Sequence, residues 1–189
     1  LAEVFDKVGD EAQSQKYASE ARAIKRNMDR FLKDGETGLY LDYRYDTETL
    51  DPTISAAGFF PFFKNLYPDN NSSRSILKSL FRSLKPENHL AIHTTNEEGP
   101  GQWDGAWSWA NLNEVAFQSL LTYGLVAEAQ ELALDYSFMV IRTFFRNDRQ
   151  FFEKFRAEDG GIAIPENSEI YGNETGFGWT NGTLAVFLN

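Results

Sequence analysis

Apolar residues recur at helical spacing through the first part of the chain. From Asp10 to Leu32 they return every three to five positions, which is the pattern of an amphipathic helix. A shorter helical stretch covers residues 1–8, and Gly9 separates the two, so Asp10 is placed to cap the second helix. Residues 37–45 alternate instead between apolar and polar positions, which predicts an extended segment or a short strand.

Further helices are predicted along the rest of the chain. They cover residues 54–66, 73–84, 109–123, 125–145 and 179–189. Pro61 implies a kink or a late first turn in the first of these, and Gly124 separates the third from the fourth. The stretches 85–104 and 147–175 are predicted to be mostly irregular. Loops of this length in a compact domain are usually functional, so the all-α pattern places candidate chemistry in these two stretches.

Composition and charge exclude several classes of partner. The net charge of −10 disfavours a nucleic-acid backbone or an anionic membrane surface, whereas a small neutral substrate meets no such penalty. The composition is that of a soluble globular protein, and no apolar run is long enough for a membrane span. The chain has no cysteine and no nucleotide-binding motif, so we expect no cofactor. His89 and His93 lack a third ligand, so we expect no metal site.

Two features bear weakly on localisation. Asn-x-Ser/Thr sequons begin at Asn70, Asn71, Asn173 and Asn181, and such sequons also arise by chance. Together with the absence of cysteine, they leave localisation open, with a slight preference for the secretory route.

Three segments carry candidate chemistry. Gln102-Trp103-Asp104 combines side chains that hydrogen-bond hydroxyl groups with an aromatic face that suits a pyranose ring, although Asp104 could instead cap a helix. Glu153 lies in the run Phe-Phe-Glu-Lys-Phe. There, burial would raise its pKa and Lys154 would lower it, but these residues alone favour a solvent-facing Glu at a helix end. The string Gly-Phe-Gly-Trp-Thr-Asn-Gly, residues 176–182, allows close backbone approach, and Thr180 or Asn181 could cap the helix that follows.

The order and spacing of these segments resemble the trehalase family of inverting glycoside hydrolases. Gln-Trp-Asp is followed about fifty residues later by Glu-Lys-aromatic, and then by Gly-Phe-Gly-Trp-Thr-Asn-Gly. Upstream, the helix that ends at residue 32 and the segment 37–43 resemble the family's helix and its Gly-x-Tyr/Phe-x-Asp-Tyr turn. The resemblance covers nearly the whole chain.

The resemblance implies a fold, a reaction and a set of site residues. The fold would be an (α/α)6 toroid, of which this chain holds the C-terminal half as a single partial catalytic domain, residues 1–189. The reaction would be hydrolysis of the α,α-1,1 bond of trehalose, with Glu153 as the general base of an acid–base pair. The sugar-binding residues implied are Gln102, Trp103, Asp104, Trp109, Glu169, Phe177 and Trp179.

The sequence departs from the family pattern in three places. The family's general-acid Asp, in a Gly-Trp-Asp-aromatic-Ser motif, has no equivalent here, so we expect the missing N-terminal half of the domain to supply it. The two prolines and the Asn that follow Gln-Trp-Asp in the family are replaced by Ala106, Asn111 and Trp107. Residues 164–175 replace a glycine-rich run, so the second pocket carboxylate is either Glu169 or Glu174. Another α-glucosidase, or a non-catalytic sugar-binding protein, therefore stays open as an alternative.

Overall fold

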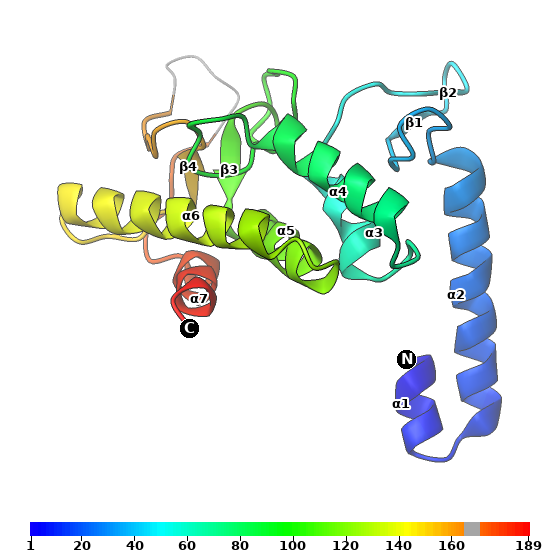
Figure 1. The fold of residues 1–189 in the computed structure, drawn as a ribbon. Helices are drawn as coiled ribbons and strands as arrows, with labels where there is room; N and C mark the ends of the chain where they lie inside the picture. Colours follow the sequence, from blue (N-terminus) through cyan, green and yellow to red (C-terminus); the bar gives the residue numbers. More distant parts are fainter. Residues whose placement is uncertain (165–170) are drawn as a thin grey trace. The chain divides into compact units, whose positions relative to one another are not determined.

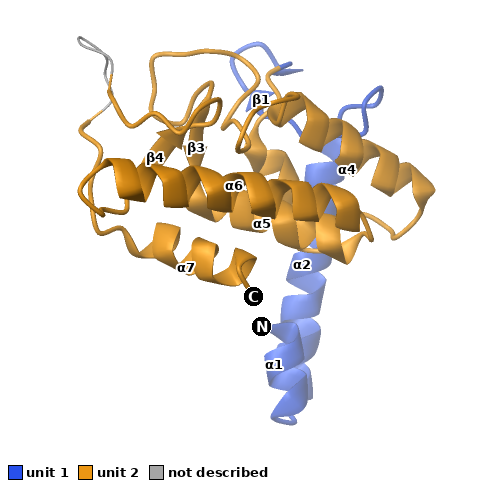
Figure 2. Ribbon diagram, turned by 60° about the vertical axis from the view of Figure 1, so that its left-hand side comes forward, with its two compact units in different colours: residues 1–52 blue, residues 53–189 orange. Residues whose placement is uncertain are grey.

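The computed structural model describes residues 1–164 and 171–189 and divides them into two compact units. Unit 1 is residues 1–52 and unit 2 is residues 53–189 (Figure 2). Helices form about half of each unit, and the described strands are short (Figure 1). The prediction that residues 1–189 are one partial catalytic domain stays a prediction.

Unit 1 begins with the two predicted helices. Helix α1 is Ala2–Lys7 and helix α2 is Glu11–Phe31. The Asp10 carboxylate accepts a hydrogen bond from the backbone N–H of Gln13 at 3.1 Å, so the predicted N-cap of α2 is confirmed. Gly9 makes the turn between the helices with a φ of +79°, a value that glycine adopts without strain.

The extended segment predicted over residues 37–45 is shorter in the structure. Strand β1, Tyr43–Arg44, pairs antiparallel with strand β2, Thr49–Leu50. Before it, Tyr40 forms an isolated antiparallel bridge with Lys33. The Asp34 carboxylate accepts hydrogen bonds from both the backbone and the side chain of Thr37. These bonds hold the turn between Lys33 and Tyr40, so the predicted segment is divided between a turn, a bridge and a short strand.

In unit 2, the helix predicted over residues 54–66 is two short pieces. A 3-10 helix η1, Ala56–Phe59, leads into helix α3, Phe60–Phe63, with Pro61 in the first turn, where its missing N–H costs nothing. Helix α4, Asn71–Leu84, begins two residues earlier than predicted, because the Asn70 side chain caps it.

Three helices lie together in the second half of unit 2. Helix α5 is Ala110–Thr122, helix α6 is Val126–Arg146 and helix α7 is Gly178–Phe187 (Figure 1). Gly124 ends the first of them with a φ of +73°, as predicted. Helix α5 packs against both α6 and α7. The buried core around these helices includes Tyr136, Met139, Val140, Phe155 and Leu184.

The strand pair in unit 2 was not predicted from the sequence. Strand β3, Trp107–Trp109, pairs antiparallel with strand β4, Lys154–Arg156, so that Trp109 lies opposite Lys154. Each strand has three residues, so the alternation in Trp-Ser-Trp and Lys-Phe-Arg is too short to indicate a strand. The pairing joins residues that follow the first predicted irregular stretch to residues within the second, and it positions the candidate site.

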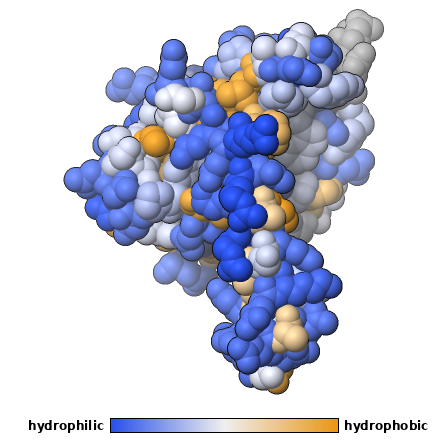
Figure 3. Space-filling model, turned by 90° about the vertical axis from the view of Figure 1, so that its right-hand side faces the viewer, coloured by the Kyte–Doolittle hydropathy of each residue, from blue (hydrophilic) through white to orange (hydrophobic). Residues whose placement is uncertain are grey.

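Part of the surface of unit 2 is apolar. Leu134, Phe138 and Phe145 are 71%, 56% and 69% exposed, and their spacing places them on one face of α6. A groove of about 430 Å³ lies beside them between α5, α6 and α7. Figure 3 views the molecule from the side of α1 and α2, and the face that it shows is mostly hydrophilic, with hydrophobic residues in separate patches. No described helix is long and apolar enough to cross a membrane.

A cluster of charges joins α4 to α6. The Arg82 guanidinium binds both carboxylate oxygens of Glu131 at 2.7 Å. The buried Lys85 ammonium contacts Glu131 at 2.9 Å and Asp135 at 2.7 Å. The hydrogen bond from Arg82, opposed by partial burial and aided by Lys85, lowers the pKa of Glu131 to about 2.

We expect this cluster to make the protein acid-sensitive. The pKa of Glu131 is lower in the folded state than its ordinary 4.5, so protons favour unfolding. Its stabilising contribution is therefore complete above pH 4.5 and is lost as the pH falls towards 2. Urea unfolding at several pH values should show this loss, and Glu131→Gln should reduce it and lower the stability at pH 7. Glu20→Gln, at an exposed position of α2, is the matched control; equal pH profiles for the two variants would contradict the prediction.

Candidate functional site

Glu153 is a buried carboxylate in unit 2. The residue is 3% exposed and lies at a bend immediately before strand β4, so it is not a solvent-facing Glu at a helix end. Its backbone N–H donates to the carbonyl oxygen of Glu174 at 2.9 Å, and its own carbonyl oxygen accepts from the indole N–H of Trp179 at 3.3 Å. The main chain of Glu153 is thus fixed from two sides.

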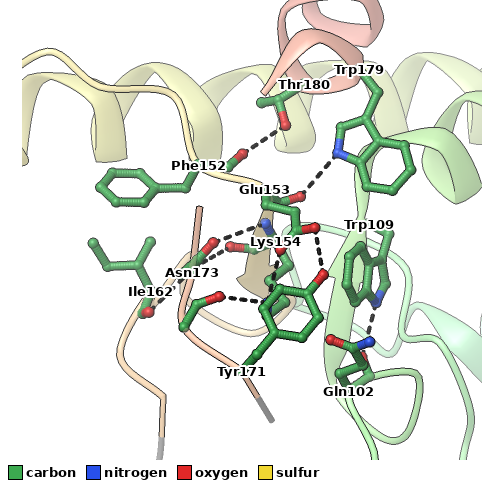
Figure 4. Close-up of polar contacts among 11 residues, drawn as sticks. Gln102, Trp109, Phe152, Glu153, Lys154, Ile162, Tyr171, Asn173, Trp179 and Thr180 are labelled. Carbon is green, nitrogen blue, oxygen red and sulfur yellow. Dashed lines mark hydrogen bonds and ion pairs between the residues drawn. The ribbon is translucent and has the colours of Figure 1, made fainter. Parts of the chain in front are cut away.

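Both carboxylate oxygens of Glu153 have a donor. The Lys154 ammonium contacts Oε2 at 2.9 Å, and the Tyr171 hydroxyl donates to Oε1 at 2.6 Å (Figure 4). Tyr171 is 46% exposed, whereas Lys154 is fully buried, so the two donors approach from regions of different solvent access. Partial desolvation, followed by the hydrogen bond to the Glu153 carboxylate and its charge, raises the pKa of Tyr171 to about 12, so its hydroxyl is a protonated donor at neutral pH.

Lys154 is enclosed by aromatic rings and backbone. Its ammonium lies 3.8 Å from the centre of the Tyr171 ring and 5.3 Å from that of Trp109, and it donates to the Gly172 carbonyl oxygen at 3.3 Å. Ring faces attract a cation, and the carbonyl satisfies a further donor. The position opposite Trp109 in the β3–β4 pair is what brings the ammonium to this place.

The predicted aromatic residues form one cluster. The rings of Trp103 and Trp109 stack with centroids 3.9 Å apart, and Trp109 meets Trp179 edge to face at 5.8 Å. Phe177 extends the cluster, with its ring 4.8 Å from that of Trp179. Trp109 is fully buried while Trp103 is 41% exposed, so Trp103 is the member that can offer an accessible face to a ligand.

Gln102 and Asp104 make different contacts within the loop that contains them. The Gln102 carbonyl oxygen accepts from the indole N–H of Trp109 at 3.1 Å, and its side-chain Oε1 is buried without a hydrogen-bond partner among the described residues. Asp104 accepts from the backbone N–H of Gly101 at 2.9 Å. Helix α5 has Trp109 as its N-cap, so Asp104 does not cap it and instead fixes the loop. A Cβ atom at Gly101 would collide with the Asp104 carboxylate.

The start of α7 differs from the predicted capping. Neither Thr180 nor Asn181 caps the helix, whose N-cap is Phe177 without a side-chain bond. The Thr180 hydroxyl instead donates to the carbonyl oxygen of Phe152 at 2.7 Å (Figure 4). The Gly-Phe-Gly-Trp-Thr-Asn-Gly string therefore fastens α7 to the segment Phe152-Glu153 that precedes strand β4.

Residues 171–176 run beside residues 151–155 and contain contacts that sequence reasoning missed. The Asn173 side chain accepts from the Lys154 N–H at 3.2 Å and donates to the Lys154 carbonyl oxygen at 2.8 Å. The position of Lys154 next to Glu153 in the sequence could have indicated its role, whereas no sequence motif indicated that Tyr171 or Asn173 contacts the site. Glu174 is exposed, and Glu169 lies outside the described residues, so the choice between them as second carboxylate stays open.

Comparisons with known proteins agree on one family. The family model described as Trehalase matches residues 1–189. The periplasmic trehalase of Escherichia coli O1:K1 / APEC is 26% identical over all of this chain, which covers 32% of that protein. The putative periplasmic trehalase of Escherichia coli O157:H7 is also 26% identical, with 33% of its length covered. The chain thus spans about a third of the length of these curated relatives.

A solved structure supports the fold. The neutral trehalase Nth1 from Saccharomyces cerevisiae superposes with a TM-score of 0.72 at 21% identity, over 93% of this chain and 30% of that one. The predicted fold class, all-α and part of an (α/α)6 toroid, is thereby confirmed.

Proposed function

The chain belongs to the trehalase family, and we propose that it forms the C-terminal part of a larger catalytic domain that hydrolyses the α,α-1,1 bond of trehalose with inversion. The observation that carries the proposal is the Glu153 carboxylate, which is buried beside stacked tryptophans and held by donors on both oxygens. Carboxylates in such surroundings are suited to general acid–base work.

In this mechanism Glu153 is the general base. It removes a proton from a water molecule as the water oxygen attacks the anomeric carbon of one glucose unit. The bond from that carbon to the bridging oxygen breaks, and a general acid protonates the departing oxygen. We assign the acid to the part of the domain outside this chain. We assign stacking against the sugar ring to Trp103. The other proposed sugar-binding residues are Gln102, Asp104, Trp109, Phe177 and Trp179.

The apolar face of α6 supports the existence of a larger domain. Three large apolar residues are exposed on one helix face beside an apolar groove. Exposed apolar patches of this kind usually mark a surface that another element covers. We therefore expect the rest of the toroid to lie against this face, and the chain to associate or precipitate when it is expressed without it.

Two other functions are weighed against this one. The replacements at Ala106, Trp107 and Asn111 favour a related α-glucosidase that acts on another glucosyl oligosaccharide. A non-catalytic sugar-binding protein is the other alternative. Glucose release from trehalose and from other α-linked glucosyl disaccharides, measured on the whole enzyme, separates the three. Activity on another α-glucoside without activity on trehalose would overturn the trehalase proposal, and sugar binding without turnover would support the third.

Trp103→Ala is expected to weaken sugar binding. Its exposed ring can stack on a pyranose, an interaction of about 0.5–1.5 kcal/mol beyond buried area, so KM or the Kd for glucose should rise roughly 3–10-fold. Titration followed by tryptophan fluorescence or calorimetry measures this. Tyr45→Ala, at an aromatic residue of unit 1 that is 89% exposed, is the control and should leave affinity unchanged. Unaltered affinity in Trp103→Ala would remove this residue from the site.

A further inference from the structure

Lys154 has an environment that a structural ion pair does not need. It is fully buried, its ammonium contacts Glu153 Oε2 at 2.9 Å, and the rings of Trp109 and Tyr171 lie against it (Figure 4). Burying a lysine carries a desolvation cost that one ion pair rarely returns in full. A neutral apolar residue opposite Trp109 would stabilise the strand pair more simply.

Lys85 provides the contrast within unit 2. It is also buried, but its partners Glu131 and Asp135 lie on the surface of α6, with side chains 33% and 38% exposed. The side chain of Glu153 is 5% exposed and belongs to the candidate site. The charge of Lys154 therefore acts on a carboxylate that is assigned a chemical role, whereas the charge of Lys85 acts on carboxylates that connect two helices.

The two oxygens of Glu153 are not equivalent in this arrangement. Oε2 is held by an ammonium that is itself fixed by the Gly172 carbonyl oxygen and by two rings. Oε1 is bonded to the hydroxyl of Tyr171, a residue that is 46% exposed and that borders solvent. A hydroxyl donor at 2.6 Å also marks a position where a water molecule could bind Oε1 with the same geometry.

Building on the proposed function, we propose that Lys154 is a positioning residue. It anchors Oε2 of Glu153, so that Oε1 is the oxygen that takes the proton from water. Lys154 does not touch the sugar. Its effect is on the orientation of the base, and misplacement of a catalytic group by about 1 Å can cost on the order of 100-fold in rate.

The test compares Lys154→Met with wild type in the whole enzyme. We expect kcat to fall by about 10–100-fold with KM nearly unchanged, because the sugar contacts remain. Lys85→Met is the matched control, because it removes another buried ammonium; it should lower stability and leave kcat nearly unchanged.

A double-mutant cycle separates this inference from the proposed function. If Lys154 acts through Glu153, then Lys154→Met should have little further effect on kcat in a Glu153→Gln background. Multiplied losses would overturn the inference while Glu153 keeps its role. Wild-type activity of Glu153→Gln alone would overturn the proposed function itself.

A second substitution covers the case in which Lys154→Met does not fold. Lys154→Gln retains most of the side-chain length and one hydrogen-bond donor for Oε2, without the charge. Its kcat should fall by about 10-fold with KM unchanged. A kcat equal to that of wild type in this folded variant would overturn the inference.

Discussion

Glu153→Gln in the whole enzyme is expected to lower kcat at least about 100-fold, the usual loss when a general base is removed. The amide can still occupy the same space, because its oxygen can accept from Lys154 while its NH2 group can donate to the Tyr171 hydroxyl. It cannot take a proton from water. Initial rates of glucose release from trehalose give kcat, and KM should change little because the tryptophan cluster is untouched.

The control addresses the charge of Lys154. Glu153→Gln leaves a buried ammonium without its carboxylate, which is destabilising by itself. Glu153→Asp keeps the negative charge and withdraws it by one methylene group, so Lys154 stays partly compensated while neither carboxylate oxygen reaches the water. Thermal unfolding should separate the two variants, and kcat should be low in both. Near-wild-type kcat in either folded variant would refute Glu153 as the base.

The helices were largely predictable because local chemistry fixes their ends. The Asp10 side chain caps α2, and Gly124, with its positive φ, separates α5 from α6. These signals lie within a few residues of the boundaries that they set. The stretch around Pro61 was harder, because an apolar run does not distinguish one long buried helix from two short turns.

The site was predictable as a list of residues but not as an arrangement. Motif order identified Glu153 and the tryptophans, and the structure brings Trp109 and Trp179 into contact. The β3–β4 pair links residues 107–109 to residues 154–156 and so places Trp109 opposite Lys154. Strands of three residues are too short for an alternating pattern to reveal them in the sequence. The partners of Lys154 include Gly172, which is eighteen residues away along an irregular stretch, so no local pattern indicated them.

Trp109→Ala is expected to have the largest effect on stability. Trp109 is fully buried, stacks on Trp103, meets Trp179 edge to face and donates to the Gln102 carbonyl oxygen. Truncating a buried tryptophan to alanine costs roughly 3–5 kcal/mol, because the apolar surface is lost and a cavity remains. Urea unfolding of the purified protein measures the change, and a loss below about 1 kcal/mol would contradict the packing described.

Two further variants show which contact of Trp109 matters. Trp109→Phe keeps a ring between Trp103 and Trp179 but removes the indole N–H, so it should cost less than alanine and should loosen the Gln102 loop. Trp103→Ala removes the other half of the stack from a site that is 41% exposed, so its stability cost should be smaller than that of Trp109→Ala even though it weakens sugar binding. Because the ring of Trp109 also faces the Lys154 ammonium, its loss should lower kcat as well as raise KM. A change in KM alone would mean that the tryptophan cluster serves the sugar but not the carboxylate beside it.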